Sequence, residues 1–180
     1  MRKALYMFGI LDDSDLEWLS KSGSTRLLEA GKTIITQGKP VGSLFIVLNG
    51  ELQVYSEEIE IARLQSGEIV GEISFVDSRP PLASVKAVVD SSVFAINAEL
   101  VRGKLAKDAS FASRFYRAVA IFLADRLRVT TSRFGYRRAD QDAVENTDPD
   151  ELYPELLEAI DLAATRFDKL LRRISAHTAG

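Results

Sequence analysis

From Thr25 to Ile96 the chain alternates short β-forming segments with glycine turns, and this pattern limits the folds open to it. The β-rich segments are Leu27–Leu28, Thr33–Thr36, Leu44–Leu48, Leu52–Tyr55, Ile59–Leu64, Ala83–Val89 and Ser92–Ile96. Seven or eight short strands at this spacing predict a β-sandwich, a jelly roll or a barrel. Asn49-Gly50 is a strong hairpin signal, so the segment that contains Leu52, Val54 and Tyr55 is expected to be the return strand.

Helices are expected on both sides of the strands. In the acidic segment before them, Ser14 is the expected N-cap, Glu17 stands three residues later at the capping-box spacing, and Gly23 ends the helix. After the strands, Asn97 is expected to cap a helix over residues 98–107.

A second helix is predicted over residues 108–132, with two apolar stripes. One stripe contains Phe111, Phe115, Ala118 and Phe122, and the other contains Tyr116, Val119, Leu123 and Leu127. One stripe suffices to cover the β-domain, so the second indicates a further packing partner.

The last 42 residues contain a polar linker, residues 139–149, and a helix over about 150–175 that begins at Asp148-Pro149. Its heptad seam consists of Tyr153, Leu156, Ile160, Ala163, Phe167, Leu170 and Ile174. Two interpretations remain open: packing on its own domain, or pairing with a second copy. The expected division is therefore 1–107 for the β-domain with its flanking helices, 108–138 for the packing and dimerisation helix, 139–149 for the linker, and 150–180 for the heptad helix and tail.

Composition argues against most catalytic chemistries. The chain has no cysteine and one histidine, His177, close to its end, so thiolate chemistry and a histidine-based triad or zinc site are not expected. No apolar run approaches the roughly 20 residues of a membrane span. The net charge of −3 gives no general attraction for nucleic acid. We expect a soluble, cytoplasmic protein that is not an enzyme.

The segment from Gly67 to Ala87 contains the candidate binding site. A glycine turn at Gly71 that runs into a helical turn directs backbone N–H groups toward one point, which suits an anion, and Glu72 beside it suits a hydroxyl group. Structural roles are the alternative. Gly71 would then supply a positive φ, Glu72 would cap the helical turn or pair with Lys86 or Arg79, Arg79 would be solvated, and Ser84 would be a plain strand residue.

Over about residues 10–135 the chain resembles the cyclic-nucleotide-binding domain family, which includes the catabolite activator protein and the regulatory subunits of cyclic-AMP-dependent protein kinase. The resemblance rests on the element order and on several sequence features. These features are Gly31, Gly38, Phe45–Gly50, Gly71-Glu72 and Ala83–Ala87.

The resemblance implies an eight-stranded jelly roll flanked by helices, a ribose bound by Glu72, and a cyclic phosphate facing backbone N–H groups. The candidate ligand-binding residues are Gly71, Glu72, Ile73, Ser74, Arg79, Pro81, Leu82, Ala83 and Ser84. The chain departs from the family at Pro81, where the family has the arginine that binds the phosphate. Arg79 lies two residues earlier, before the rigid Pro80-Pro81 step.

The expected function is a non-enzymatic sensor or adaptor for cyclic AMP or cyclic GMP that signals through its C-terminal helices to a protein effector. The alternative is a scaffold that has lost its ligand. A homodimer through residues 108–132 and 150–175 is expected in either case. DNA binding is disfavoured, because no helix-turn-helix follows the long helix and the basic run around Arg126 and Arg128 is typical of a solvated helix end.

Overall fold

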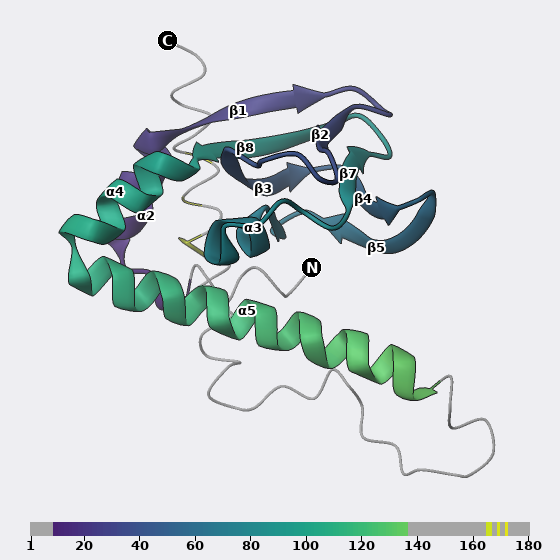
Figure 1. The fold of residues 1–180 in the computed structure, drawn as a ribbon. Coiled ribbons are helices and arrows are strands. Elements are labelled where there is room, and N and C mark those ends of the chain that lie inside the picture. Colours follow the sequence, from purple (N-terminus) through teal and green to yellow (C-terminus); the bar gives the residue numbers. More distant parts are fainter. Residues whose placement is uncertain (1–8, 137–164, 167–168, 170–171, 173–180) are drawn as a thin grey trace.

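The computed structural model describes residues 9–136 and, further on, residues 165–166, 169 and 172 (Figure 1). In chain order the elements are α2 (Asp13–Ser22), β1 (Gly23–Leu28), β2 (Thr33–Ile35), β3 (Ser43–Asn49), β4 (Glu51–Ser56), β5 (Ile59–Gln65), β6 (Ile69–Val70), α3 (Glu72–Asp77), β7 (Ser84–Ala87), β8 (Ser91–Asn97), α4 (Ala98–Lys107) and α5 (Ala109–Tyr136). The predicted linker at 139–149 and most of the predicted heptad helix lie outside the described residues.

The strands form two four-stranded sheets, in the orders β1-β8-β3-β6 and β2-β7-β4-β5. Neighbouring strands within each sheet are antiparallel. The predicted eight-stranded roll with flanking helices is therefore confirmed. Figure 1 shows α5 along the lower side of the roll, with α2 and α4 at one end.

The hairpin predicted at Asn49-Gly50 is wrong, because the two strands that it joins lie in different sheets. β3 pairs with β6 and β8, whereas β4 pairs with β5 and β7. Gly50 has φ +90°, and a Cβ there would clash with Ser91 of β8. The glycine therefore carries the chain from one sheet to the other. The actual hairpin joins β4 to β5 through Glu57 and Glu58, which have φ +49° and +69°.

The N-cap predicted at Ser14 is also wrong, because the helix begins earlier. The Asp12 side chain accepts from the Asp15 N–H at 2.9 Å, and the Asp15 side chain accepts from the Asp12 N–H at 3.0 Å. Ser14 donates its hydroxyl to Asp12, and Glu17 pairs with Lys21. Two other predicted boundaries are confirmed: Gly23 ends α2, and the Asn97 side chain caps α4. The long helix continues to Tyr136, beyond its predicted end at residue 132.

Two apolar clusters lie on opposite faces of the sheet that contains β3. Alternate residues of β3, such as Phe45 and Val47, face the interior of the roll, and Leu44 and Ile46 face the helices. Because both faces are buried, the segment is a continuous apolar run rather than an alternating one.

The first predicted stripe of α5, Phe111 to Phe122, is buried against the roll. The second stripe is divided: Val119 is buried, whereas Tyr116 and Leu127 are exposed. In the described part of the chain, no helix combines the length and apolar character needed to cross a bilayer.

Candidate functional site

The site begins at Gly71, which joins β6 to α3. Gly71 has φ +94°, and a Cβ there would lie 2.8 Å from the Ser43 carbonyl oxygen of β3. Only glycine fits both requirements, so the structural role proposed for this residue from the sequence is present. The turn places the first residue of α3, Glu72, under the helical layer.

Glu72 is buried, with 3% of its side chain exposed, and it forms an ion pair with Arg126 of α5. The Arg126 Nη1 donates to Glu72 Oε1 at 2.5 Å, and its Nη2 donates to the Ile69 carbonyl at 2.9 Å. The guanidinium also lies over the Phe122 ring, 4.5 Å from its centroid. The sequence suggested Lys86 or Arg79 as the partner of Glu72, but neither residue pairs with it. The Lys86 side chain lies over the Tyr55 ring instead.

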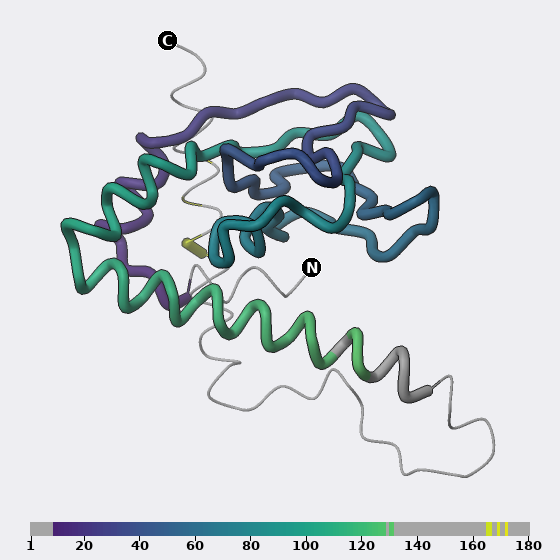
Figure 2. Tube along the Cα trace, viewed as in Figure 1, coloured from purple at the N-terminus to yellow at the C-terminus, as the bar shows by residue number. Residues whose placement is uncertain are grey.

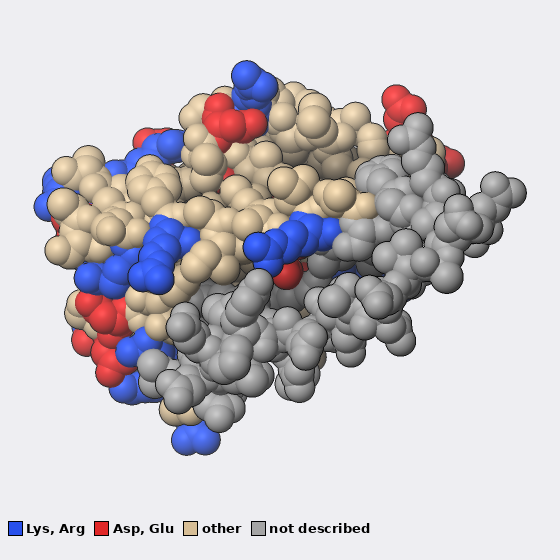
Figure 3. All heavy atoms as spheres, turned by 90° about the horizontal axis from the view of Figure 1, so that it is seen from below, with Lys and Arg blue, Asp and Glu red and all other residues tan. Residues whose placement is uncertain are grey.

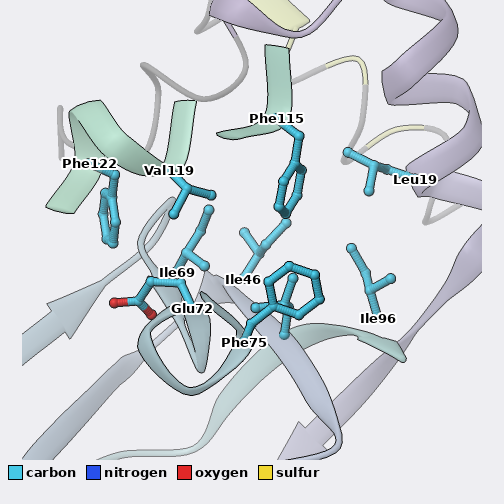
Figure 4. Close-up of a pocket in the computed structure, with 10 residues that line it drawn as sticks. Leu19, Ile46, Ile69, Glu72, Phe75, Ile96, Phe115, Val119 and Phe122 are labelled. Atoms are coloured by element: carbon cyan, nitrogen blue, oxygen red, sulfur yellow. The ribbon is translucent and has the colours of Figure 1, made fainter. Parts of the chain in front are cut away.

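Apolar side chains surround the Glu72 carboxylate. It lines a pocket between the roll and the helices together with Leu19, Leu44, Ile46, Ile69, Phe75, Ile96, Phe115, Val119 and Phe122. Figure 4 shows Glu72 at one end of this pocket, on the side of Phe122. Removal from water raises the pKa of the Glu72 carboxyl above its ordinary value, and the positive charge of Arg126 opposes this rise. The carboxylate is thus directed toward α5.

The other end of α3 is bound by α4. The Arg102 Nη2 donates to the Phe75 carbonyl at 3.1 Å, and the guanidinium lies 4.5 Å from the centre of the Phe75 ring. Two arginines from two different helices therefore fix the position of α3. A movement of α3 would disturb both helices.

The loop after α3 contains the residues expected near a phosphate. Arg79 is exposed, and within the described residues no partner is found for its side chain. The Pro81 carbonyl accepts from the Gly38 N–H at 2.9 Å, which joins the loop to the turn after β2. Ser84 is buried, and its hydroxyl accepts from the Gln37 N–H at 2.9 Å.

The remaining predicted residues present little polar chemistry. Ile73 and Leu82 are exposed by 54% and 88% respectively. Ser74 and Ala83 are half-buried. The structure therefore places the predicted site residues along one continuous segment but brings only Glu72 into an ion pair.

Arg126 is the site residue that sequence reasoning assigned wrongly, as part of a solvated basic run. It lies on the same helix face as the buried Phe115 and Phe122, at spacings of eleven and four residues. A cation at that position needs a carboxylate partner, because an unpaired buried charge is costly. This spacing was the signal available in the sequence.

Over residues 9–136 and the few described C-terminal positions, no group of three or more His, Cys, Asp or Glu side chains is placed to hold a metal ion.

Comparisons with known proteins agree with the sequence resemblance. A family model described as the cyclic nucleotide-binding domain matches residues 25–108. A cGMP-dependent protein kinase, egl-4, from Caenorhabditis briggsae is 32% identical over 68 residues, which make up 38% of this chain and 9% of the kinase. The aligned stretch is thus a small part of that relative.

Solved structures share the fold. The N-terminal domain of a transcriptional regulator from Streptomyces coelicolor A3(2) is 26% identical with a TM-score of 0.58, over 71% of this chain and 91% of that one. The catabolite activator protein of Thermus thermophilus is 19% identical with a TM-score of 0.62, over 96% of this chain and 88% of that one. At the latter identity the likeness concerns the fold alone.

Proposed function

Because residues 25–108 form a domain of the cyclic nucleotide-binding domain family, we propose that this chain is a non-enzymatic sensor or adaptor that binds cyclic AMP or cyclic GMP through that domain. The observation that carries the proposal is the Glu72–Arg126 ion pair. It connects the residue expected to bind a ribose hydroxyl with the long helix that would transmit the signal.

Ligand binding and helix position are linked in this mechanism because they involve the same carboxylate. A ribose hydroxyl that donates to Glu72 would share or replace the bond from Arg126. Any loss of that bond weakens the attachment of α5 to the roll, since Arg126 also donates to the Ile69 carbonyl. The position of α5 would then report whether the site is occupied.

Pro81 is expected to lower the affinity. The arginine that the family has at this position makes a charge-assisted hydrogen bond, and such a bond is worth roughly 1.5–3 kcal/mol. Its loss corresponds to about a ten- to hundredfold weaker affinity. Arg79 is exposed, and its side chain supplies no ion pair within the described residues.

Calorimetric titration with cyclic AMP and cyclic GMP tests the proposal. The wild type is expected to bind, Pro81→Arg to bind about ten- to hundredfold more tightly, and Glu72→Gln to bind more weakly. Nucleotide should also change amide hydrogen exchange along α5 in the wild type but not in Arg126→Met. If neither the wild type nor Pro81→Arg binds either nucleotide, the sensor proposal is refuted.

A scaffold without a ligand is the second candidate, and the outer face of α5 favours it. Tyr116 and Leu127 are exposed by 50% and 67%, and a separation of eleven residues places them on one face of the helix. Figure 3 views the molecule from below, the side of α5, and shows Lys and Arg side chains next to uncharged residues on this side. A second copy packed through α5 would cover the exposed apolar residues.

Sedimentation measurements separate the two candidates. Leu127→Glu should weaken a dimer formed through α5, whereas Leu100→Glu should not, because Leu100 is an exposed leucine of α4. The scaffold candidate requires a dimer whose mass does not respond to nucleotide. A monomer at all concentrations would exclude it.

A further inference from the structure

Carboxylates gather at the start of α2 and attract cations from distant parts of the chain. Asp15 is buried and accepts two bonds from Arg114 of α5, at 2.6 and 3.0 Å. Arg114 also lies 2.9 Å from Asp12. The third carboxylate, Asp13, is 65% exposed and is not paired with α5 in this way.

The C-terminal segment supplies the cations for Asp13. Arg166 Nε lies 3.4 Å from one oxygen of Asp13, and Lys169 Nζ lies 3.6 Å from the other. The Arg166 Nη1 donates to the carbonyl groups of Gly9 and Leu11, at 3.1 and 2.8 Å. Arg166 has 18% of its side chain exposed, which is low for an arginine.

Arg166 and Lys169 are both helical and three residues apart, so they lie on one helix face. Figure 2 shows the described part of this segment in yellow, near the purple start of the described chain. The two residues meet one carboxylate and two backbone carbonyls of the same chain, across about 155 positions of sequence.

The heptad pattern offers Arg166 no comparable partner in a second copy. In a coiled coil, the positions that flank the seam form the ion pairs between helices. Here those positions hold Leu152, Leu157, Ala159, Ala164, Arg166, Leu171 and Arg173, and none of these is acidic. Self-pairing along this seam would place arginines beside apolar residues, whereas the start of α2 provides acceptors for Arg166.

We propose that the short segment containing Arg166 and Lys169 is an intramolecular strap, which these two residues dock onto the start of α2, and that it does not pair with a second copy as a coiled coil. The strap and Arg114 of α5 bind neighbouring carboxylates of one helix turn. The strap therefore stabilises the joint between α2 and α5, and this role does not depend on any nucleotide.

Amide hydrogen exchange of the full chain at several protein concentrations tests the strap. Arg166→Ala should speed exchange in the C-terminal segment and at the first turn of α2 by about tenfold or more, because two charge-assisted hydrogen bonds are lost. Arg172→Ala is the matched control, since Arg172 is an exposed basic residue of the same segment. It should leave exchange unchanged.

Asp13→Asn gives a second variant that preserves folding, because Asp13 is exposed and is not the cap of α2. It should speed exchange in the C-terminal segment by a smaller factor. The proposal is overturned if Arg166→Ala and Arg172→Ala exchange alike. It is also overturned if the protection of the C-terminal segment in the wild type rises with protein concentration together with the mass of a dimer.

Discussion

Arg114 and Arg126 of α5 each bind a buried carboxylate, Asp15 of α2 and Glu72 of α3 respectively. The two arginines are twelve residues apart, which is about 18 Å along a helix. Removal of a carboxylate from water is costly, and only a well-placed partner offsets this cost. These two pairs therefore hold α5 at two points, one at α2 and one at α3. If α5 moved, each buried carboxylate would lose its partner at a cost in free energy.

Removing one partner of the Glu72–Arg126 pair should lower the stability more than replacing both partners with apolar residues. Arg126→Met leaves a buried carboxylate without its partner, so the free energy of unfolding should fall by about 3–5 kcal/mol at neutral pH. The double variant Glu72→Met with Arg126→Met should be much closer to the wild type, because no buried charge remains. Urea unfolding measures both. Equal losses in the single and double variants would contradict this account.

Glu72 should also give the stability of the protein a particular pH dependence. Burial raises its pKa in the folded state above the ordinary value of 4.5, so the folded protein binds this proton more tightly than the unfolded chain does. The associated stabilisation is present below pH 4.5 and is lost as the pH rises through the raised pKa. The free energy of unfolding of the wild type, relative to Glu72→Gln, should therefore decrease as the pH is raised from about 4.5.

Urea unfolding of both proteins at a series of pH values checks this dependence. The pKa of the Asp12 carboxyl is lowered, because the Ser14 hydroxyl and the Asp15 N–H donate to it. Protonation of Asp12 therefore lowers the stability of the folded protein as the pH falls below the ordinary value of 3.8, which is the opposite direction to the effect of Glu72. The effects of Asp12 and Glu72 on the free energy of unfolding therefore appear in different pH ranges. A difference between wild type and Glu72→Gln that is constant above pH 4.5 would show that Glu72 does not titrate in this way.

Among the elements, those defined by local contacts were predictable from the sequence. Asn97 caps α4 with bonds to residues two and three positions away, which any sequence pattern can represent. The Asp12-Asp13-Ser14-Asp15 run contains two overlapping capping patterns, and the observed one places Asp15 where it meets Arg114. That choice depends on α5, 99 residues away, and so was not visible locally.

The candidate site divides in the same way. The Gly71-Glu72 turn was recognisable because its residues are adjacent in the sequence. The partner of Glu72 lies 54 residues away, on another helix. The passage of the chain from one sheet to the other at Gly50 is likewise a tertiary effect, because it depends on the close approach of Ser91.

The start of α2 gives a prediction at this scale. Asp12→Ala removes the N-cap and one partner of Arg114, so the free energy of unfolding should fall by about 1–2 kcal/mol. Ser14→Ala removes only an exposed hydroxyl that donates to Asp12, and should change it by less than about 0.5 kcal/mol. Thermal or urea unfolding of the pair decides between the two caps. A larger loss for Ser14→Ala would restore the cap predicted from the sequence.

For the whole molecule, the apolar cluster on the outer face of the roll is shared between sequence-distant parts. Phe94 and Ile96 come from β8, and Phe111, Phe115 and Phe122 come from α5. The expected domain boundary after residue 107 passes through this cluster. Burial on both faces of β3 and β8 means that the roll alone would expose a large apolar surface to water.

Truncation therefore should not yield an independent β-domain. A fragment of residues 1–107 should lose the buried face of α5 and with it the partners of Phe94, Asp15 and Glu72. We expect this fragment to bind a hydrophobic dye and to unfold without a cooperative transition, whereas residues 1–138 should unfold cooperatively. Near-ultraviolet circular dichroism with urea titration measures the difference. A cooperative transition in residues 1–107 would show that α5 is an appendage to the roll, and the two buried ion pairs would then be incidental to its folding.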